Sequence, residues 1–381
     1  MSEQGKGLVI IYDPHSLQQF IWYYFTYGTG KKWDALCLPN GYKGTYMEPY
    51  CRKTGLFDTI IKDDTEYMSL GLFRKFKLIC KMTGYYIVGK RKLCAKRILN
   101  EYVGSIDDYD EVVALCDIGF ISGLCALLGD EKTISYLDDG LGDYNYRDKW
   151  SNTYKKTSLM YWQGFVMSRM GYGCAGRFYF KPTEKCIKYC AVPEEMKYRN
   201  YKEIRSFDMS NTDVDGYNNT LRRTYVGLSD IDFDSVDAVF FTDNLEVFSP
   251  NYQDYYDKCS RIIGGKHRTV LLKKHPRDGA TYSFPDGVRV IEVDNEIPAE
   301  IILPYLKGKQ IYFSIFSSII IFMQQYNYSY SILYSSQMYQ DNISNPKSTW
   351  HFHSKERVLD LCRRFSTNEY NIIETDGFVL E

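Results

Sequence analysis

The sequence contains no apolar run long enough to cross a membrane. Its longest apolar stretches, such as the one at 319–323, fall far short of the ~20 residues that a membrane-spanning helix requires. The first residues, MSEQGKG, have neither the basic leader nor the apolar segment of a signal peptide. These absences predict a cytoplasmic protein without a membrane anchor.

An excess of charge of either sign is also missing. Lys and Arg number 47 and Asp and Glu 48, so the net charge is -1, which predicts no bulk affinity for nucleic acid. Apolar residues make up 44% and charged residues 25%, the proportions of an ordinary globular protein rather than a disordered one. At 381 residues the chain exceeds the size at which one hydrophobic core stops growing, so we expect two domains.

Clusters of metal ligands are scarce. The 11 cysteines are spread along the chain, mostly in apolar settings such as those of Cys116 and Cys125, which predicts reduced, buried thiols. Cys186 and Cys190 have a spacing that a metal could use, but no second Cys or His pair stands nearby. The acidic pairs at 63–64 and 107–108 fit surface loops better than metal sites. We expect no metal and no cofactor.

What the sequence does contain is two series of strands alternating with helices. The first series has strands at 7–13, 35–39, 58–62, 111–117 and 133–139, and helices at 16–28 and 120–129. The second has strands at 237–243, 269–276, 288–294 and 310–316, and helices at 250–263, from Pro298, and at 355–365. Such alternation predicts parallel sheets, hence two Rossmann-like, doubly wound α/β domains facing across a cleft.

The domain boundaries follow from the same pattern. We predict an N-terminal Rossmann-like domain over 1–232, a C-terminal Rossmann-like domain over 233–365, and a tail over 366–381. Within the first domain, 150–232 is expected to be helical decoration plus a linker, with helices near 157–170 and 193–205.

Two adjacent carboxylates, Asp138 and Asp139, end the strand predicted at 133–139, and Gly140 lets the backbone turn sharply away. Strand geometry points the two side chains to opposite faces. One can therefore act as a base in the cleft, while the other accepts amide hydrogens and holds the loop. The alternative is a structural Asp-Gly turn.

His275 lies at the carboxyl end of the strand at 269–276, where Pro276 directs the chain out of the sheet. Basic neighbours favour an anionic ligand there: Lys273, Lys274, Arg277 and His267. A histidine in this place can hydrogen-bond a phosphate and protonate it as it leaves. The alternative is a structural histidine at a strand end.

Ser317 and Ser318 follow the strand at 310–316 and precede an apolar run that could begin a helix. Hydroxyls and free amides at such a point suit a phosphate, although serine is also an ordinary helix cap.

Glu300 falls in the first turn of the helix expected from Pro298. Its carboxylate could hold ribose hydroxyls, or it could simply stabilise the helix dipole.

Taken in order, the acidic pair with Gly140, His275-Pro276, the Pro-Ala-Glu that ends at Glu300, and Ser317-Ser318 resemble the motifs of bacterial sialyltransferases, especially those that sialylate lipooligosaccharide. The longer string DDGLGDY at 138–144 strengthens the match. The resemblance covers the skeleton of both domains and leaves 150–232 and 337–381 unmatched. It implies the GT-B fold and an inverting, metal-free displacement of CMP from CMP-sialic acid.

The resemblance also assigns the catalytic roles. Asp139, favoured over Asp138, would be the general base for the acceptor hydroxyl, and His275 the acid that assists departure of the CMP phosphate. Some lipooligosaccharide sialyltransferases take their base from the second domain, where Asp254 or Asp257 would be the counterpart.

The donor-binding residues that the resemblance implies gather in the second domain. Ser317 and Ser318 would bind the phosphate and Glu300 the ribose or cytidine. The remaining positions lie beside His275 or in the loop where family members touch the nucleotide: Lys274, Pro276, Thr242, Asp243 and Asn244.

Other readings of the same motifs stay open. His-Pro and a phosphate-binding serine would serve Kdo or CDP-glycerol transfer equally well, and a non-catalytic nucleotide-sugar-binding protein could keep the scaffold. A plain interaction protein would bind no CMP at all.

The basic stretch from Arg74 to Arg97 holds nine Lys or Arg residues and no acid, interleaved with apolar residues. It could seat the enzyme on an anionic membrane or near a charged glycan, or form a solvated helix face. The acceptor implied by the resemblance is a lipooligosaccharide or capsule glycan, and the family includes homodimers.

Overall fold

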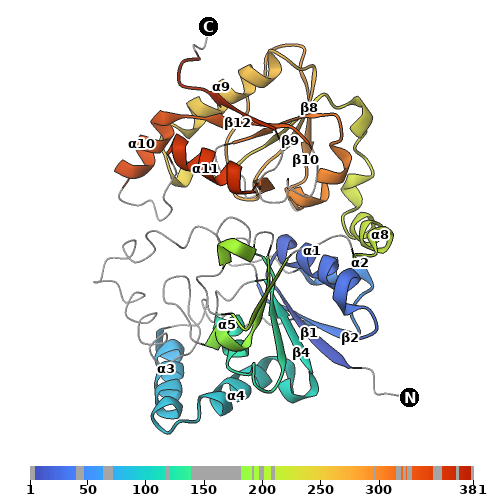
Figure 1. Ribbon diagram of the computed structural model, residues 1–381, viewed down its shortest axis with the longest axis vertical. Helices are drawn as coiled ribbons and strands as arrows, with labels where there is room; N and C mark the ends of the chain where they lie inside the picture. Colours follow the sequence, from blue (N-terminus) through green and yellow to red (C-terminus); the bar gives the residue numbers. More distant parts are fainter. Residues whose placement is uncertain are drawn as a thin grey trace. The chain divides into compact units, whose positions relative to one another are not determined.

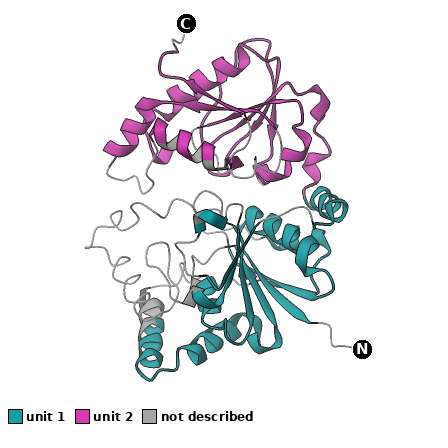
Figure 2. Cartoon of the chain, viewed as in Figure 1, with its two compact units in different colours: residues 1–224 teal, residues 225–381 magenta. Residues whose placement is uncertain are grey.

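The chain divides into two compact units, Met1–Thr224 and Tyr225–Glu381 (Figure 2). The computed structural model describes residues 5–39, 47–62, 72–115, 120–138, 182–190, 193–196, 201–206, 211–295, 297–314, 319–320, 323, 328–345, 354–365 and 369–378. In this part of the chain no helix is long and apolar enough to cross a membrane.

The first unit contains a seven-stranded, wholly parallel sheet in the order β3-β2-β1-β4-β5-β6-β7 (Figure 1). Its strands are β1 (Lys6–Ile11), β2 (Lys32–Cys37), β3 (Thr59–Lys62), β4 (Glu111–Ala114), β5 (Thr133–Tyr136), β6 (Ile187–Cys190) and β7 (Glu203–Ser206). The winding direction reverses between β1 and β4, which is the topological switch point where ligands of doubly wound sheets bind.

The helices of this unit are α1 (Pro14–Tyr23), continued by a π-helical turn (Tyr24–Gly28), α2 (Glu48–Thr54), α3 (Leu72–Ile87), α4 (Arg91–Val103), α5 (Phe120–Ala126) and α8 (Val214–Thr224). Helix α1 begins sharply after β1 because Asp13 caps it. The Asp13 carboxylate accepts a hydrogen bond from the Ser16 backbone NH (2.8 Å), and the Ser16 hydroxyl accepts one from the Asp13 NH (2.9 Å). Pro14 occupies the first turn, where it lacks only an NH that would be unpaired anyway.

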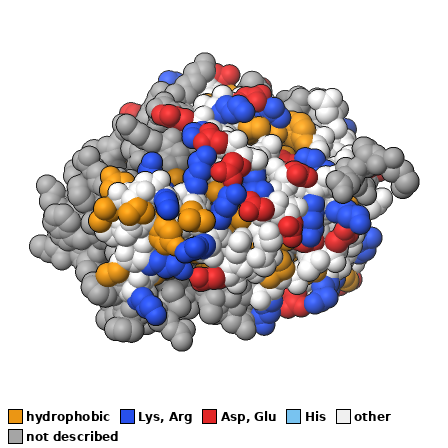
Figure 3. Space-filling model, turned by 90° about the horizontal axis from the view of Figure 1, so that it is seen from below, with side chains coloured by type: hydrophobic (Ala, Val, Ile, Leu, Met, Phe, Trp, Pro, Cys, Tyr) orange, Lys and Arg blue, Asp and Glu red, His pale blue; other side chains and the backbone are white. Residues whose placement is uncertain are grey.

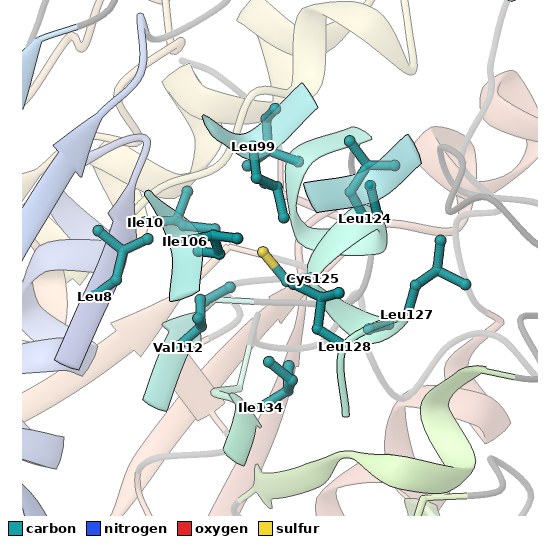
Figure 4. Close-up of a cluster of buried hydrophobic side chains, with 14 of the residues drawn as sticks. Leu8, Ile10, Leu99, Ile106, Val112, Leu124, Cys125, Leu127, Leu128 and Ile134 are labelled. Atoms are coloured by element: carbon teal, nitrogen blue, oxygen red, sulfur yellow. The ribbon is translucent and has the colours of Figure 1, made fainter. Parts of the chain in front are cut away.

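A hydrophobic cluster fixes α4 and α5 on one face of the first sheet (Figure 4). Alternate residues of the strands point into it, among them Leu8 and Ile10 of β1 and Val112 of β4, as the two-residue period of a strand requires. Leu99 of α4 and Cys125 of α5 meet them, and all five side chains are at most 2% exposed.

The second unit contains a six-stranded parallel sheet in the order β10-β9-β8-β11-β12-β13. Its strands are β8 (Ala238–Phe241), β9 (Thr269–Lys273), β10 (Arg289–Val293), β11 (Gln310–Phe313), β12 (Tyr330–Tyr334) and β13 (Tyr370–Glu374). Its helices are α9 (Tyr252–Gly264), α10 (Ser336–Ser344) and α11 (Lys355–Phe365). The switch point lies between β8 and β11.

The predicted fold class, two Rossmann-like doubly wound α/β domains, is confirmed by these topologies, and each predicted strand overlaps an observed one. Two expectations about the connections differ from the structure. Residues 150–232 are not only helical decoration and linker, because β6 and β7 extend the first sheet there. Near 193–205, where a helix was expected, the structure has a 3-10 turn at Pro193–Met196 and then β7. The tail contains β13, which pairs with β12.

The helix expected from Pro298 is also absent. Two 3-10 turns stand in its place, Ala299–Ile301 and Leu303–Tyr305. Pro304 lacks the backbone NH that a continuing helix needs, so the chain cannot extend the first turn.

Among the described cysteines, all except Cys80 are buried, as expected for reduced thiols. The expectations at Cys116, at 63–64 and at 157–170 fall on residues outside the described part. Asp107 and Asp108 form a 3-10 turn, and Asp107 pairs with Lys96 (2.8 Å), in keeping with a surface loop.

Candidate active site

The carboxyl edge of the second sheet gathers polar side chains around its switch point. Thr242 and Asp243 follow β8, and Ser314 follows β11. The Ser314 hydroxyl donates to the Asp243 carboxylate (3.1 Å), which ties the two strand ends together. Edges of this kind are where open parallel sheets bind nucleotides.

The loop after β9 presents His275 at the same edge. The His275 backbone NH donates to the Thr242 hydroxyl (3.1 Å), and the His275 carbonyl accepts from the Asp278 NH (2.9 Å). The ring Nδ1 accepts from the Arg277 NH (3.2 Å). In the neutral ring the proton therefore belongs on Nε2, which is left as a hydrogen-bond donor.

The environment of His275 favours the neutral imidazole. Burial, and then the positive charges of Arg277 and Lys273, lower the pKa of His275 from 6.5 to about 4. A ligand with negative charge would reverse the two electrostatic contributions. In the free protein the ring is therefore neutral at neutral pH.

Asp278 holds this loop in shape. Its carboxylate accepts hydrogen bonds from the Thr242 hydroxyl, the Tyr282 hydroxyl and the Ala280 NH. Burial and the Asp278 charge raise the pKa of Tyr282, so its hydroxyl stays a donor. Tyr256 plays a similar part at Asp243, whose NH donates to the Tyr256 oxygen (3.0 Å) while the Tyr256 hydroxyl donates to the Asp243 carbonyl.

The basic residues beside His275 are mostly engaged with the protein. Lys273 is only 3% exposed, and its ammonium donates to the Lys274 carbonyl (2.8 Å). Lys274 pairs with Glu292 (2.9 Å) and lies over the Tyr282 ring (5.3 Å to the centroid). They set the local positive charge rather than reaching outward.

One predicted neighbour of His275 is wrong. His267 precedes β9 whereas His275 follows it, so the two histidines lie at opposite edges of the sheet. The His267 ring instead contacts the Tyr312 hydroxyl (2.9 Å).

The structure gives the positions of most other residues predicted on the donor side. Glu300 lies in the 3-10 turn Ala299–Ile301, after β10, and is partly buried, while Pro276 is exposed. Asn244 follows Asp243, and its amide oxygen is buried without a hydrogen bond, as is that of Asn295 after β10. Ser317 and Ser318 lie outside the described residues.

The carboxyl edge of the first sheet holds Asp138, which is fully buried two residues after β5. Its backbone carbonyl lies 3.3 Å from Nε2 of His15, in the first turn of α1. Beside it, the buried Lys188 of β6 donates its ammonium to the Leu137 carbonyl (2.6 Å). Asp139 and Gly140 lie outside the described residues.

The alternative bases of the second unit sit on α9. Asp254 is exposed and pairs with Lys258 one turn later (2.9 Å). Asp257 accepts a hydrogen bond from Gln253 (3.0 Å). Each carboxylate therefore has a partner four residues away on the same helix.

Sequence reasoning missed four participants at these edges: His15, Lys188, Asp278 and Ser314. Asp278 lies two residues after the strand predicted at 269–276, so its position could have found it. Ser314 fell inside the strand predicted at 310–316, which ends earlier, at Phe313, in the structure. Lys188 had no signal, because β6 was not expected. In the described part of the chain, no group of three His, Cys, Asp or Glu side chains could hold a metal.

Two doubly wound domains with polar side chains at their switch points are the architecture of nucleotide-binding enzymes. The profile of the alpha-2,8-polysialyltransferase (POLYST) family matches residues 96–335, well over half of the sequence. The chain belongs to this family, and it is a nucleotide-sugar glycosyltransferase of the bacterial sialyltransferase type. No curated protein matches the sequence.

Solved structures with a similar fold are distant in sequence. Arabidopsis thaliana UGT89C1 complexed with UDP is 9% identical with a TM-score of 0.44, over 95% of this chain and 91% of that one. Acinetobacter baumannii MurG is 9% identical with a TM-score of 0.42, over 98% and 87%. The UDP-GlcNAc 2-epimerase from Methanocaldococcus jannaschii is 10% identical with a TM-score of 0.45, over 94% and 99%.

Proposed function

We propose that the protein is an inverting, metal-independent sialyltransferase that moves sialic acid from CMP-sialic acid to a hydroxyl of a cell-surface glycan. The observation that carries this proposal is the His275 loop. Its ring has Nδ1 occupied by a backbone NH and Nε2 left as a donor, in a setting of fixed positive charge. A donor with one phosphate and its own carboxylate needs hydrogen-bond donors and positive charge rather than a divalent cation.

In this proposal His275 protonates the departing CMP phosphate, with Ser317 and Ser318 as further phosphate contacts. The buried amide oxygens of Asn244 and Asn295 can accept hydrogen bonds from amino or hydroxyl groups of the nucleoside. Glu300 contacts the ribose.

The base that we propose for the acceptor hydroxyl is Asp139. Complete burial of the Asp138 side chain suits the partner that holds the loop, and adjacent residues of an extended chain point to opposite sides. Membership of the alpha-2,8-polysialyltransferase family makes an acceptor that ends in sialic acid the first candidate, with lactose-terminated lipooligosaccharide as the second.

CMP release from CMP-sialic acid, measured with sialylated and lactose-terminated acceptors, tests the proposal. His275→Gln and Asp139→Asn should each lower turnover by about 100-fold or more, as for other acid–base groups. The matched controls are His267→Gln, at the opposite edge of the sheet, and Asp107→Asn, in a surface turn. Equal losses of turnover in variant and control would refute the roles assigned to His275 and Asp139.

Two further arms identify the donor and the role of metals. EDTA should leave turnover unchanged, whereas loss that magnesium restores would point to another donor class. Turnover of CMP-Kdo or CDP-glycerol in place of CMP-sialic acid would establish the runner-up donors. Binding of CMP without turnover of any donor would favour a non-catalytic protein.

A further inference from the structure

The turn between α3 and α4 carries consecutive exposed apolar side chains. Tyr86, Ile87 and Val88 are 42%, 76% and 61% exposed, and Leu93, in the first turn of α4, is 41% exposed. Single exposed apolar residues are normal on protein surfaces, but a contiguous group marks an interaction site. We call residues 86–93 the α3–α4 tip.

Backbone hydrogen bonds fix the shape of the α3–α4 tip. The Lys90 NH donates to the Tyr85 carbonyl (2.8 Å), the Gly89 NH donates to the Tyr86 carbonyl (3.0 Å), and Gly89 has a φ of 70°. This is a Schellman cap, in which the residue after the glycine is commonly apolar and packs on the last helical turn. Here that residue is Lys90, so the cap adds no apolar contact to the end of α3, and Ile87 is exposed on a well-capped helix end.

The hairpin behind the tip is anchored in the core. Met82 of α3 and Cys94, Ala95, Ile98 and Leu99 of α4 belong to the buried cluster under the first sheet. The inward-facing apolar side chains of the hairpin are thus buried against the core of the first unit. The apolar side chains of the tip are an addition that the core does not need.

Basic side chains surround the tip. Lys90 and Arg91 are exposed, and the Arg91 guanidinium lies 5.8 Å from the centroid of the Tyr86 ring. Within the tip, an acid pairs with Lys92 (Asp130, 2.7 Å), and outside it acids pair with Lys81 (Glu101, 3.2 Å) and Lys96 (Asp107, 2.8 Å). Within the described residues, no ion pair holds Lys77 or Lys90. Figure 3 shows apolar and basic side chains side by side toward the left of the face that it views.

We propose that the α3–α4 tip docks the protein on a membrane that contains anionic lipids, the charge of a cytoplasmic leaflet. Tyr86, Ile87 and Val88 would enter the headgroup region, and Lys90 and Arg91 would meet lipid phosphates. A free anionic glycan would use the basic side chains but not three neighbouring apolar ones. The combination therefore favours a lipid surface, and it does so independently of the proposed donor.

Flotation of the full chain with vesicles tests this docking. The protein should float with phosphatidylcholine vesicles that contain phosphatidylglycerol and not with phosphatidylcholine alone, and salt should release it because exposed charges are screened over about 8 Å at physiological ionic strength. Lys90→Gln with Arg91→Gln should weaken binding roughly 25-fold, at about fivefold per basic residue. Ile87→Ser with Val88→Ser should weaken it about tenfold or more.

Matched controls lie in the second unit. Val226→Ser with Ile343→Ser removes two apolar side chains that are each 56% exposed, and Lys266→Gln with Lys307→Gln removes two exposed charges. Both should float like the wild type. Thermal melting should be unchanged in all four variants, because every altered side chain is exposed.

Three results would overturn the docking proposal. The first is a failure of the flotation comparison: wild-type protein does not float with anionic vesicles, or the controls lose as much binding as the tip variants. The second is binding of free polysialic acid, dependent on Lys90 and Arg91, without vesicle binding. The third is a change of oligomeric state in the tip variants by light scattering, which would make the tip a contact between two copies.

Discussion

Binding of a phosphate should make His275 take up a proton. With a pKa of about 4 in the free protein, only roughly 0.3% of the rings are protonated at pH 6.5. Return of the pKa to its ordinary value of 6.5 on binding requires about 3 kcal/mol, the strength of one or two hydrogen bonds to charged groups. The uptake would then be about half a proton at pH 6.5 and fall to about 0.03 at pH 8.

Calorimetry of CMP binding in buffers of different ionisation enthalpy measures this uptake. CMP titrates as well, since its phosphate has a pKa of about 6, so the difference between wild type and His275→Gln isolates the histidine. Binding with identical proton uptake in the two proteins would refute the phosphate contact.

The same lowered pKa makes a second, ligand-free measurement possible. A histidine whose pKa is lowered by folding stabilises the native state fully above its unfolded value of about 6.5. That stabilisation is lost as the pH falls from about 6.5 to about 4. Urea unfolding should therefore show a steeper loss of stability over this window in wild type than in His275→Gln.

Two further predictions concern positioning and packing. Asp278→Asn should lower turnover about 30-fold, because the Asp278 carboxylate bridges Thr242 and the loop, and a charged hydrogen-bond acceptor contributes roughly 2 kcal/mol. The control Asp286→Asn, at an exposed position, should leave turnover unchanged. Equal turnover in the two variants would show that Asp278 does not position His275. Gly7→Ala would place a Cβ 2.4 Å from the buried Trp33 ring and should lower the free energy of unfolding by about 1–3 kcal/mol, measured by urea denaturation. Gly84→Ala, in α3 with open space around it, should instead raise it by up to about 1 kcal/mol.

The sequence predicts the strands well where apolar residues follow one another without interruption. All five strands of β1 to β5 and the first four of the second sheet were found by pattern, because buried parallel strands read as continuous apolar runs. β6 was missed because Lys188 interrupts its apolar run, and β7 because Glu203, Arg205 and Ser206 leave it a single apolar residue. β13 was missed because its apolar run is only two residues long, between Asn371 and Glu374.

The candidate site was predicted residue by residue but not as a network. The position of His275 at a strand end is a local property that the sequence displays. Its bond to Thr242 spans a separation of 33 residues, and the approach of His15 to Asp138 one of 123. Such partners depend on which strands become neighbours, and short-range patterns do not encode the order β9-β8-β11.

The two sheets share a strand order, so each strand end of one unit has an equivalent strand end in the other. In each sheet, the first strand lies beside the fourth, and the second lies on its other side. The fifth strand of the first unit is followed by buried Asp138, and that of the second unit by Ser335, which caps a helix. The second strand of the first unit is followed by buried Leu38, and the loop after that of the second unit carries His275. The two units thus share a strand order but carry their polar groups after different strands.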